Sequence, residues 1–230
     1  FNNSEYLDVA QHGIDYLRKC HLNSKTGGYA WVLNDKEIQD STNYCYGLAF
    51  VLLAYSTAYK AGLSEAKNYI DETFNLMEKY FWSADDGLYY DEISADWSRV
   101  SEYRGQNANM HSCEALIMAF EATQEEKYLQ RALLIARNIC QRQASLADGL
   151  IWEHYDSDWQ IDWLFNKDTP DDLFRPWGFQ IGHLTEWAKL LIILERYANE
   201  DWLLIRAQEL FDVAVNKGWN SNSGGLVYGI

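Results

Sequence analysis

Short segments that begin with glycine and continue with aromatic and aliphatic residues recur along this chain, at intervals of about 60 to 75 residues. They begin at Gly27 (GGYAWVLND), Gly87 (GLYYDEIS), Gly149 (GLIWEHYD) and Gly224 (GGLVYG). Each interval holds two segments with helical spacing of apolar residues, together with a loop. A repeat on this scale predicts stacked helical hairpins, in which each unit buries its apolar face against its neighbours.

Apolar residues recur every three or four positions in about seven segments, which predicts seven helices. Ser64, a typical N-cap residue, marks the start of the third helix. Nothing between the segments resembles a long strand or a βαβ unit, so the predicted fold class is all-α. The predicted helices are residues 4–19, 44–61, 64–80, 110–123, 126–141, 182–197 and 201–216.

The predicted helices alternate in character. Those that precede each Gly-aromatic segment carry a single apolar stripe, whereas those that follow one, such as residues 44–61, are more uniformly apolar. A single stripe suits an outer helix that faces water, and a uniformly apolar surface suits an inner helix with neighbours on most sides. We therefore expect residues 1–230 to form one domain, a curved or closed double layer of helices.

The composition argues against several classes of function. A net charge of -15 is unfavourable for binding nucleic acid or an anionic membrane, and the longest apolar run, Leu48–Tyr55, is too short to span a bilayer. The sequence contains no P-loop, GxGxxG or GxSxG motif. Since the four cysteines form no CxxC pair, we expect buried, reduced thiols and a cytoplasmic protein. These cysteines are Cys20, Cys45, Cys113 and Cys140.

Aromatic residues make up 15% of the chain, with ten Trp and sixteen Tyr. Flat, amphipathic side chains of this kind suit a site for carbohydrates or other ring-shaped ligands. A large aromatic core would account for them equally well, and the composition leaves both interpretations open.

Two of the predicted inner helices begin with a histidine and a glutamate three residues apart, His111 with Glu114 and His183 with Glu186. At this spacing the two side chains share a helix face. In the first turn the helix dipole disfavours an imidazolium while the carboxylate favours it, so the histidine is poised for proton transfer near neutral pH. Each pair could instead only cap or pack its helix, but the occurrence of both pairs on equivalent helices favours chemistry.

A divalent metal ion is a second chemical interpretation of these four side chains, because di-metal sites in helix bundles also use Glu and His three residues apart. Such sites run Glu-x-x-His and need further carboxylates. The remaining inner helix, residues 44–61, offers no carboxylate in its first turns. We therefore expect no metal ion here.

Further candidates lie where the loops meet the inner helices. Arginine and asparagine can donate hydrogen bonds to sugar hydroxyls, and tryptophan can face the C–H side of a sugar ring. Either arginine could instead form a structural salt bridge. His154 either joins the site or packs beneath it, and His12 and His21 are expected at the surface. The candidate binding residues are Tyr46, Arg104, Asn107, Arg175 and Trp177.

Three motifs in order, YRGQNANMHSCEAL, WEHYDSDW and RPWGFQIGHLTEWAKLL, resemble segments of the N-acylglucosamine 2-epimerase superfamily, nearest to its mannose isomerase and sulfoquinovose isomerase branch. The resemblance runs through nearly all of the chain. It implies an (α/α)6 barrel with a pocket at one mouth, and proton transfer on a ring-opened sugar without a metal or cofactor. It also implies that His183 is an acid/base histidine. The implied pocket residues are Tyr46, Asn107, His111, Arg175 and Glu186.

Members of this family also carry an arginine ahead of the region where this chain starts and a second catalytic histidine beyond the region where it ends. We therefore expect an incomplete barrel, either a fragment or a form that pairs with another chain near residues 4–19 or 201–216, with little turnover by the 230 residues alone. The function implied is aldose–ketose isomerisation or 2-epimerisation of a small sugar. The alternative is a catalytically silent carbohydrate-binding or assembly module.

Overall fold

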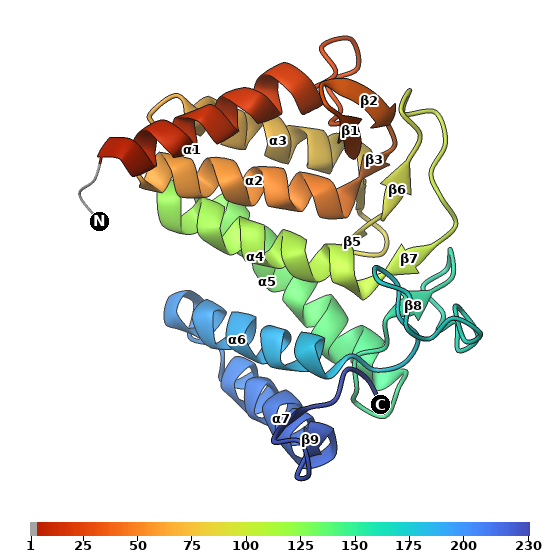
Figure 1. Ribbon diagram of the computed structural model, residues 1–230. Helices are drawn as coiled ribbons and strands as arrows, with labels where there is room; N and C mark the ends of the chain where they lie inside the picture. The colour runs from red at the N-terminus through yellow and green to blue at the C-terminus, as the bar shows by residue number, and fades with distance from the viewer. Residues whose placement is uncertain (1–3) are drawn as a thin grey trace.

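In the computed structural model, which describes residues 4–230, the helices alternate between an inner and an outer layer, as predicted. The inner helices α2, α4 and α6 lie side by side in Figure 1, with α2 packed on α4 and α4 on α6. Two π-helical segments, η1 (Leu17–His21) and η2 (Asn138–Gln143), continue α1 and α5. The seven α-helices of the described residues are α1 (Ser4–Tyr16), α2 (Cys45–Lys60), α3 (Ala66–Tyr80), α4 (Gln106–Thr123), α5 (Glu126–Arg137), α6 (Ile181–Ala198) and α7 (Asp201–Gly218).

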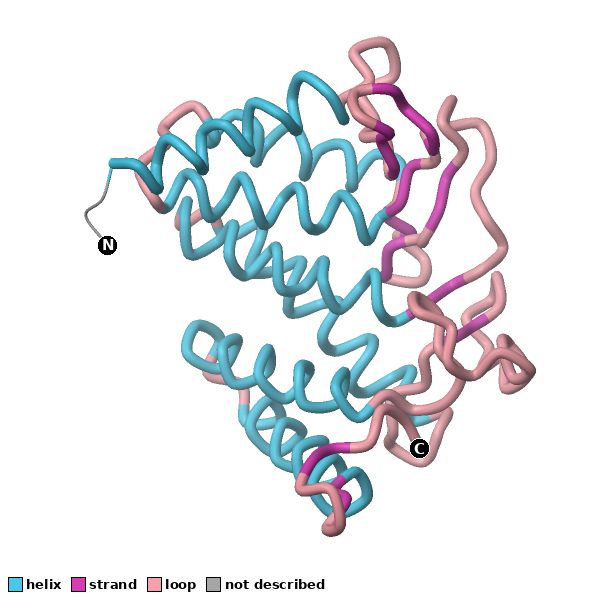
Figure 2. Tube along the Cα trace, in the orientation of Figure 1, coloured by secondary structure: helices cyan, strands magenta, loops and turns pink. Residues whose placement is uncertain are grey.

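The strands are short, and most of them lie together at one end of the helical array, on the right in Figures 1 and 2, whereas the last ladder lies at the bottom, at the end of α7. All of those in residues 4–230 pair antiparallel in two-stranded ladders, and the longest has 4 residues. The prediction of an all-α class without long strands is therefore confirmed. The ladders are β1 (Val32–Asn34) with β2 (Glu37–Asp40), β3 (Asn43–Tyr44) with β6 (Glu92–Ile93), β4 (Trp82–Ser83) with β5 (Leu88–Tyr89), β7 (Arg104–Gly105) with β8 (His154–Tyr155), and β9 (Trp219–Asn220) with β10 (Gly225–Leu226).

The four Gly-aromatic segments share a backbone feature. The glycine that opens each one has a positive φ, between 64° and 84°, a conformation that strains residues with a side chain. In three of the segments the chain then folds back on the residues before the turn. These pairs are Leu22 with Tyr29, Trp82 with Tyr89, and Trp219 with Leu226. The sequence repeat is thus a structural repeat, which turns the chain at the end of each outer helix.

Two predicted helix starts are wrong. Helix α4 begins at Gln106 rather than at Met110, because amides that look like loop residues in the sequence are buried and bonded in the structure. Asn109, for example, bonds to the backbone N–H and carbonyl of Tyr89, at 2.9 and 3.0 Å. Helix α3 begins at Ala66, and Glu65 rather than Ser64 occupies its N-cap position without a capping hydrogen bond from its side chain.

Much of the aromatic surplus is core. Trp152, Trp187, Tyr55 and Tyr128 are fully buried, and the burial of each large side chain contributes about 1.5–3 kcal/mol. The four cysteines are free thiols, three of them buried and Cys20 half-buried.

The flanks of the array stay apolar and exposed. Val9 on α1 is 70% exposed, and Ile205 and Phe211 on α7 are 61% and 50% exposed. That these flanks contact another chain stays a prediction. Within residues 4–230, none of the helices combines the length and the apolar character needed to cross a bilayer.

Candidate active site

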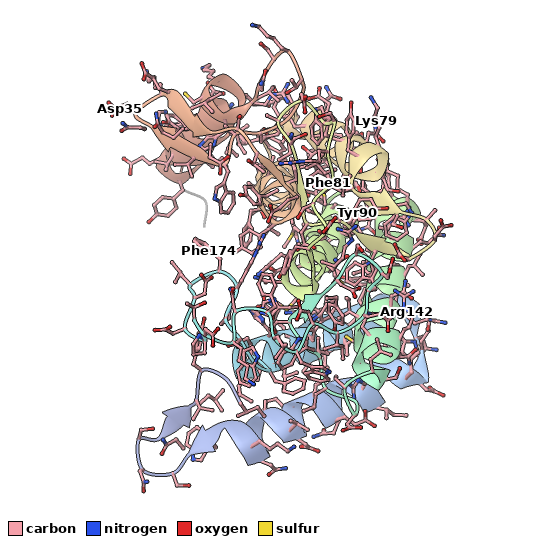
Figure 3. All side chains as sticks on the ribbon, turned by 90° about the vertical axis from the view of Figure 1, so that its right-hand side faces the viewer. Asp35, Lys79, Phe81, Tyr90, Arg142 and Phe174 are labelled. Atoms are coloured by element: carbon pink, nitrogen blue, oxygen red, sulfur yellow. The ribbon has the colours of Figure 1, made fainter. Side chains whose placement is uncertain are left out.

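Two cavities lie at the loop end of the helices. The arginine cavity, of about 370 Å³, is lined chiefly by Tyr46, Asp91, Glu92, Tyr103, Asn107 and Arg175. The histidine cavity, of about 280 Å³, is lined chiefly by Asn107, Phe174, Gln180, His183 and Tyr228. Asn107 and Phe174 line both, so the cavities adjoin. Figure 3, which faces the loop end, shows Phe174 at the left, on the opposite side from Lys79 and Arg142.

His183 lies in the first turn of α6 and contacts a carboxylate that the sequence analysis did not single out. Its Nδ1 lies 3.0 Å from both carboxylate oxygens of Glu153, a residue only 3% exposed. Gln106, the first residue of α4, donates to the same carboxylate over 2.9 Å and accepts a hydrogen bond from Trp187 Nε1 over 2.7 Å. These contacts fix the carboxylate relative to the imidazole.

The ladder between β7 and β8 brings Glu153 to this place. Gly105 pairs with His154, and the N–H of Gln106 donates to the carbonyl of Glu153 over 3.2 Å. The segment before β8 therefore holds the carboxylate of Glu153 at the N-terminus of α4, which belongs to a different helical hairpin.

The pairing with Glu153 also sets the proton affinity of His183. Burial by itself would lower the pKa of the imidazole, but the negative charge of Glu153 and the hydrogen bond to it outweigh burial, so the pKa lies above its usual value. When Nδ1–H donates to Glu153, the lone pair is on Nε2. His183 then has the features of a general base whose protonated form is stabilised.

His111 forms the predicted contact with Glu114, with its Nδ1 3.3 Å from the carboxylate. It lies in the second turn of α4 rather than in the first, because the helix begins earlier than predicted. The rings of Tyr46 and Phe50 pack against the imidazole, at centroid distances of 5.1 and 4.8 Å. The hydrogen bond from His111 and the charge of Lys189 together outweigh desolvation and lower the pKa of Glu114 to about 2.

The charge of Glu186 helps to raise the pKa of His183, as predicted, but within the described residues no hydrogen bond joins the two side chains, and the carboxylate of Glu186 lies with His111 and Glu114. Side-chain atoms of these three residues all lie within 4.8 Å of one another. The imidazole of His183 is already hydrogen-bonded to Glu153. The ammonium of Lys189, one turn along α6, lies 3.5 Å from Glu186 and 2.9 Å from Glu114 and so holds these two carboxylates near each other.

The cluster of His111, Glu114 and Glu186 has the nitrogen and oxygen donors that a divalent ion uses. The ammonium of Lys189 already provides a positive charge to both carboxylates. That the protein works without a metal ion stays a prediction.

The two arginines differ. Arg175 lines the arginine cavity, where its guanidinium pairs with Glu92 and lies 4.0 Å above the ring of Tyr103. Arg104 is buried, donates to the carbonyls of Ser101 and Tyr103, and lines neither cavity. The structural salt bridge considered for either arginine is found at Arg175, which also lines the cavity, whereas Arg104 forms no ion pair among the described residues and bonds to loop carbonyls instead.

The remaining candidates divide in the same way. Tyr46 lines the arginine cavity, and Asn107 lines both cavities. Trp177 lines neither: its Nε1 donates to the carbonyl of Trp163 over 2.8 Å. His154 packs beneath the site, with Nδ1 2.9 Å from the Tyr103 hydroxyl. Of the other two histidines, His12 is exposed, as predicted, and His21 is half-buried.

Known proteins of similar sequence identify the family of this chain. The sequence model of the N-acylglucosamine 2-epimerase (GlcNAc 2-epimerase) family matches residues 1–230. D-mannose isomerase from Marinomonas mediterranea is 58% identical over 229 residues, which cover 99% of this chain and 58% of that protein. D-mannose isomerase from Thermobifida fusca is 34% identical over 224 residues, covering 96% of this chain and 55% of the relative. The chain thus spans little more than half the length of these curated relatives.

Solved structures of similar fold agree with the sequence comparison. A crystal structure of D-mannose isomerase, 58% identical, aligns with a TM-score of 0.96 over 99% of this chain and 58% of that one. Cellobiose 2-epimerase from Spirochaeta thermophila, 20% identical, aligns with a TM-score of 0.85 over 98% and 57% and shows the fold alone. The predicted (α/α)6-barrel type is confirmed, over about half of the barrel. Because the family's sequence model covers the whole chain and its structures share the same hairpins, this chain belongs to the N-acylglucosamine 2-epimerase family.

Proposed function

We propose that this chain provides part of the active site of a sugar isomerase that interconverts an aldose and its ketose, with D-mannose and D-fructose as the pair. The observation that carries the proposal is the contact of His183 with Glu153 at a cavity that also contains Asn107. The 58% identity to a D-mannose isomerase supports the choice of sugar.

The reaction begins on the open-chain aldose. Nε2 of His183 takes the proton from C2, and the electron pair of that C–H bond forms the C1=C2 bond of an enediolate as charge moves to O1. Protonation of O1, loss of the O2 proton and return of a proton to C1 leave the ketone at C2. Glu153 stabilises the imidazolium that forms in the first step.

Residues of both cavities hold the sugar in this scheme. Asn107 Oδ1 is buried, with no hydrogen-bond partner among residues 4–230, and a sugar hydroxyl would satisfy it. Burial and the charge of Glu186 raise the pKa of Tyr46, so its phenol stays protonated and can donate. His111 provides a second imidazole on the neighbouring helix for the proton transfers between O1 and O2.

The test uses a longer form of the protein that completes the barrel, because little turnover is expected from these 230 residues alone. This form is incubated with D-mannose, D-glucose or D-fructose in D₂O, and the recovered sugars are analysed by NMR. We expect deuterium at C2 of mannose and C1 of fructose, with interconversion of the two. Exchange at C2 that yields glucose from mannose would point to 2-epimerisation instead. Absence of exchange with all three sugars would contradict the proposal and favour a silent carbohydrate-binding module.

A further inference from the structure

Asp91 lies in the arginine cavity, between the N-termini of two inner helices. Its backbone carbonyl accepts the N–H of Cys45, the first residue of α2, over 2.9 Å. Its Oδ2 accepts the N–H of Gly105, the N-cap residue of α4, over 2.7 Å. The residues that follow on these helices, Tyr46 and Asn107, line the same cavity as Asp91.

The second carboxylate oxygen of Asp91, Oδ1, takes no part in these two hydrogen bonds. No hydrogen-bond donor to Oδ1 is found in the described part of the chain, and Oδ1 is not among its fully buried atoms that lack a partner, so this oxygen keeps a small exposed area although the residue as a whole is only 7% exposed. A charged oxygen with so little access to water gains from a donor that fills the cavity. Asn107 Oδ1, in the same cavity lining, is a fully buried acceptor without a partner among residues 4–230. Two acceptors without donors in one cavity match a ligand that carries several hydroxyl groups.

We propose that Asp91 is a sugar-binding residue, whose Oδ1 accepts a hydrogen bond from a hydroxyl of the aldose beside Asn107. The choice of ligand rests on the proposed isomerase function. The contact is strong because the acceptor is charged, and a sugar that lacks a hydroxyl at that position leaves a buried charge unpaired.

The charges around Asp91 give this contact a pH dependence. Burial raises the pKa of Asp91 to about 7, although the Gly105 N–H and the charges of Arg175 and Arg104 oppose the shift. A hydroxyl that donates to the carboxylate favours the ionised form, so sugar binding lowers this pKa. By linkage, affinity rises as the pH increases through about 7. The buried thiol of Cys45 also interacts with the charge of Asp91. The other ionisable residues that line the cavity, besides Arg175, are Tyr44, Tyr46, Glu92, Tyr103 and Asp172.

Calorimetric titration with D-mannose between pH 6 and pH 8 tests the proposal. Asp91→Asn keeps an oxygen for Gly105 but puts an amide donor where Oδ1 now accepts. We expect it to bind mannose roughly 10- to 100-fold more weakly at pH 8, the usual loss for a hydrogen bond to a charged group, and to lose the pH dependence. Asp85→Asn, which removes an equal charge from an exposed turn before β5, should bind like the parent protein. Affinity of Asp91→Asn within about twofold of the parent would overturn the proposal.

A second measurement does not depend on the folding of the variant. The ¹³C NMR shift of the Asp91 carboxyl in the parent protein should titrate near pH 7 and move to lower pH in saturating mannose. An unchanged titration would overturn the proposal. Deuterium exchange tests the isomerase function separately. If the sugars exchange but the Asp91 titration does not respond to mannose, only the role of Asp91 is refuted. If mannose binds through Asp91 without exchange, only the isomerase function is refuted, and if no mannose binds, both are.

Discussion

The two histidine centres start from the same sequence spacing and differ in what they contact. His111 pairs with Glu114 on its own helix, and that carboxylate is shared with the half-exposed Lys189. His183 pairs with Glu153, 30 residues earlier in the chain and almost fully buried. Spacing along a helix decides which side chains share a face, but the surrounding loops decide which carboxylate reaches the imidazole.

The largest expected difference between the centres is in turnover. His183→Asn should lower kcat for mannose isomerisation by roughly 10²–10⁴-fold, the usual share of general acid–base catalysis, while much of the sugar affinity remains. His111→Asn should lower kcat less, because its partner Glu114 is already neutralised by Lys189. Initial rates and mannose titrations of both variants measure this. Equal losses of kcat would mean that the two imidazoles act as one unit.

Replacing the carboxylate partners sharpens the comparison. The pKa of His183 is raised, so its base form, and with it kcat/KM, is lost as the pH falls through that value. Glu153→Gln removes the charge that raises this pKa, so the acid limb of the profile should move to lower pH. We expect kcat to fall by roughly 10–100-fold, as when a partner that orients an imidazole is removed. Glu114→Gln is the matched control, and its acid limb should stay in place; a shift of equal size in both variants would contradict the assignment.

The smallest expected effect concerns stability. Lys189→Met should lower the free energy of unfolding by about 0.2–1 kcal/mol at pH 7, the usual range for exposed ion pairs. The pKa of Glu114 in the folded protein is lowered to about 2. Its ionised carboxylate therefore stabilises the fold at pH values above the usual pKa of a glutamate, and this stabilisation is lost as the pH falls toward 2. Urea unfolding at pH 7 and pH 2 measures this, and the two proteins should converge at the lower pH. A difference that persists at pH 2 would show that the lysine acts through packing.

The fold was predictable because its signals are local. Apolar periodicity and the glycine at each turn report on nearby residues, and both the alternation of helices and the repeat are present in the structure. The start of α4 was missed because Gln106 and Asn109 find their partners in distant segments, which local propensity does not show.

The site was predictable only in part. His183, Asn107 and Tyr46 belong to the cavities, as expected, whereas Arg104 binds loop carbonyls. Glu153 belongs to the motif WEHYDSDW but is not among the predicted site residues, because its partners Gln106 and His183 lie far from it in the sequence. The available signal was a carboxylate flanked by Trp152 and His154, since aromatic neighbours favour burial and a buried carboxylate requires a partner.

The short ladder between β7 and β8 limits how the loop before β8 can change length in this chain. Side chains along a strand alternate between two faces, so a slip of one residue exchanges everything that a strand presents. Gly105 opposite His154 is the register that leaves Glu153 beside Gln106 and His183. An insertion of a single residue between η2 and β8 that moved this register would present Trp152 or His154 in place of the carboxylate, and would deprive the imidazole of its partner without altering any residue that is proposed to bind the sugar.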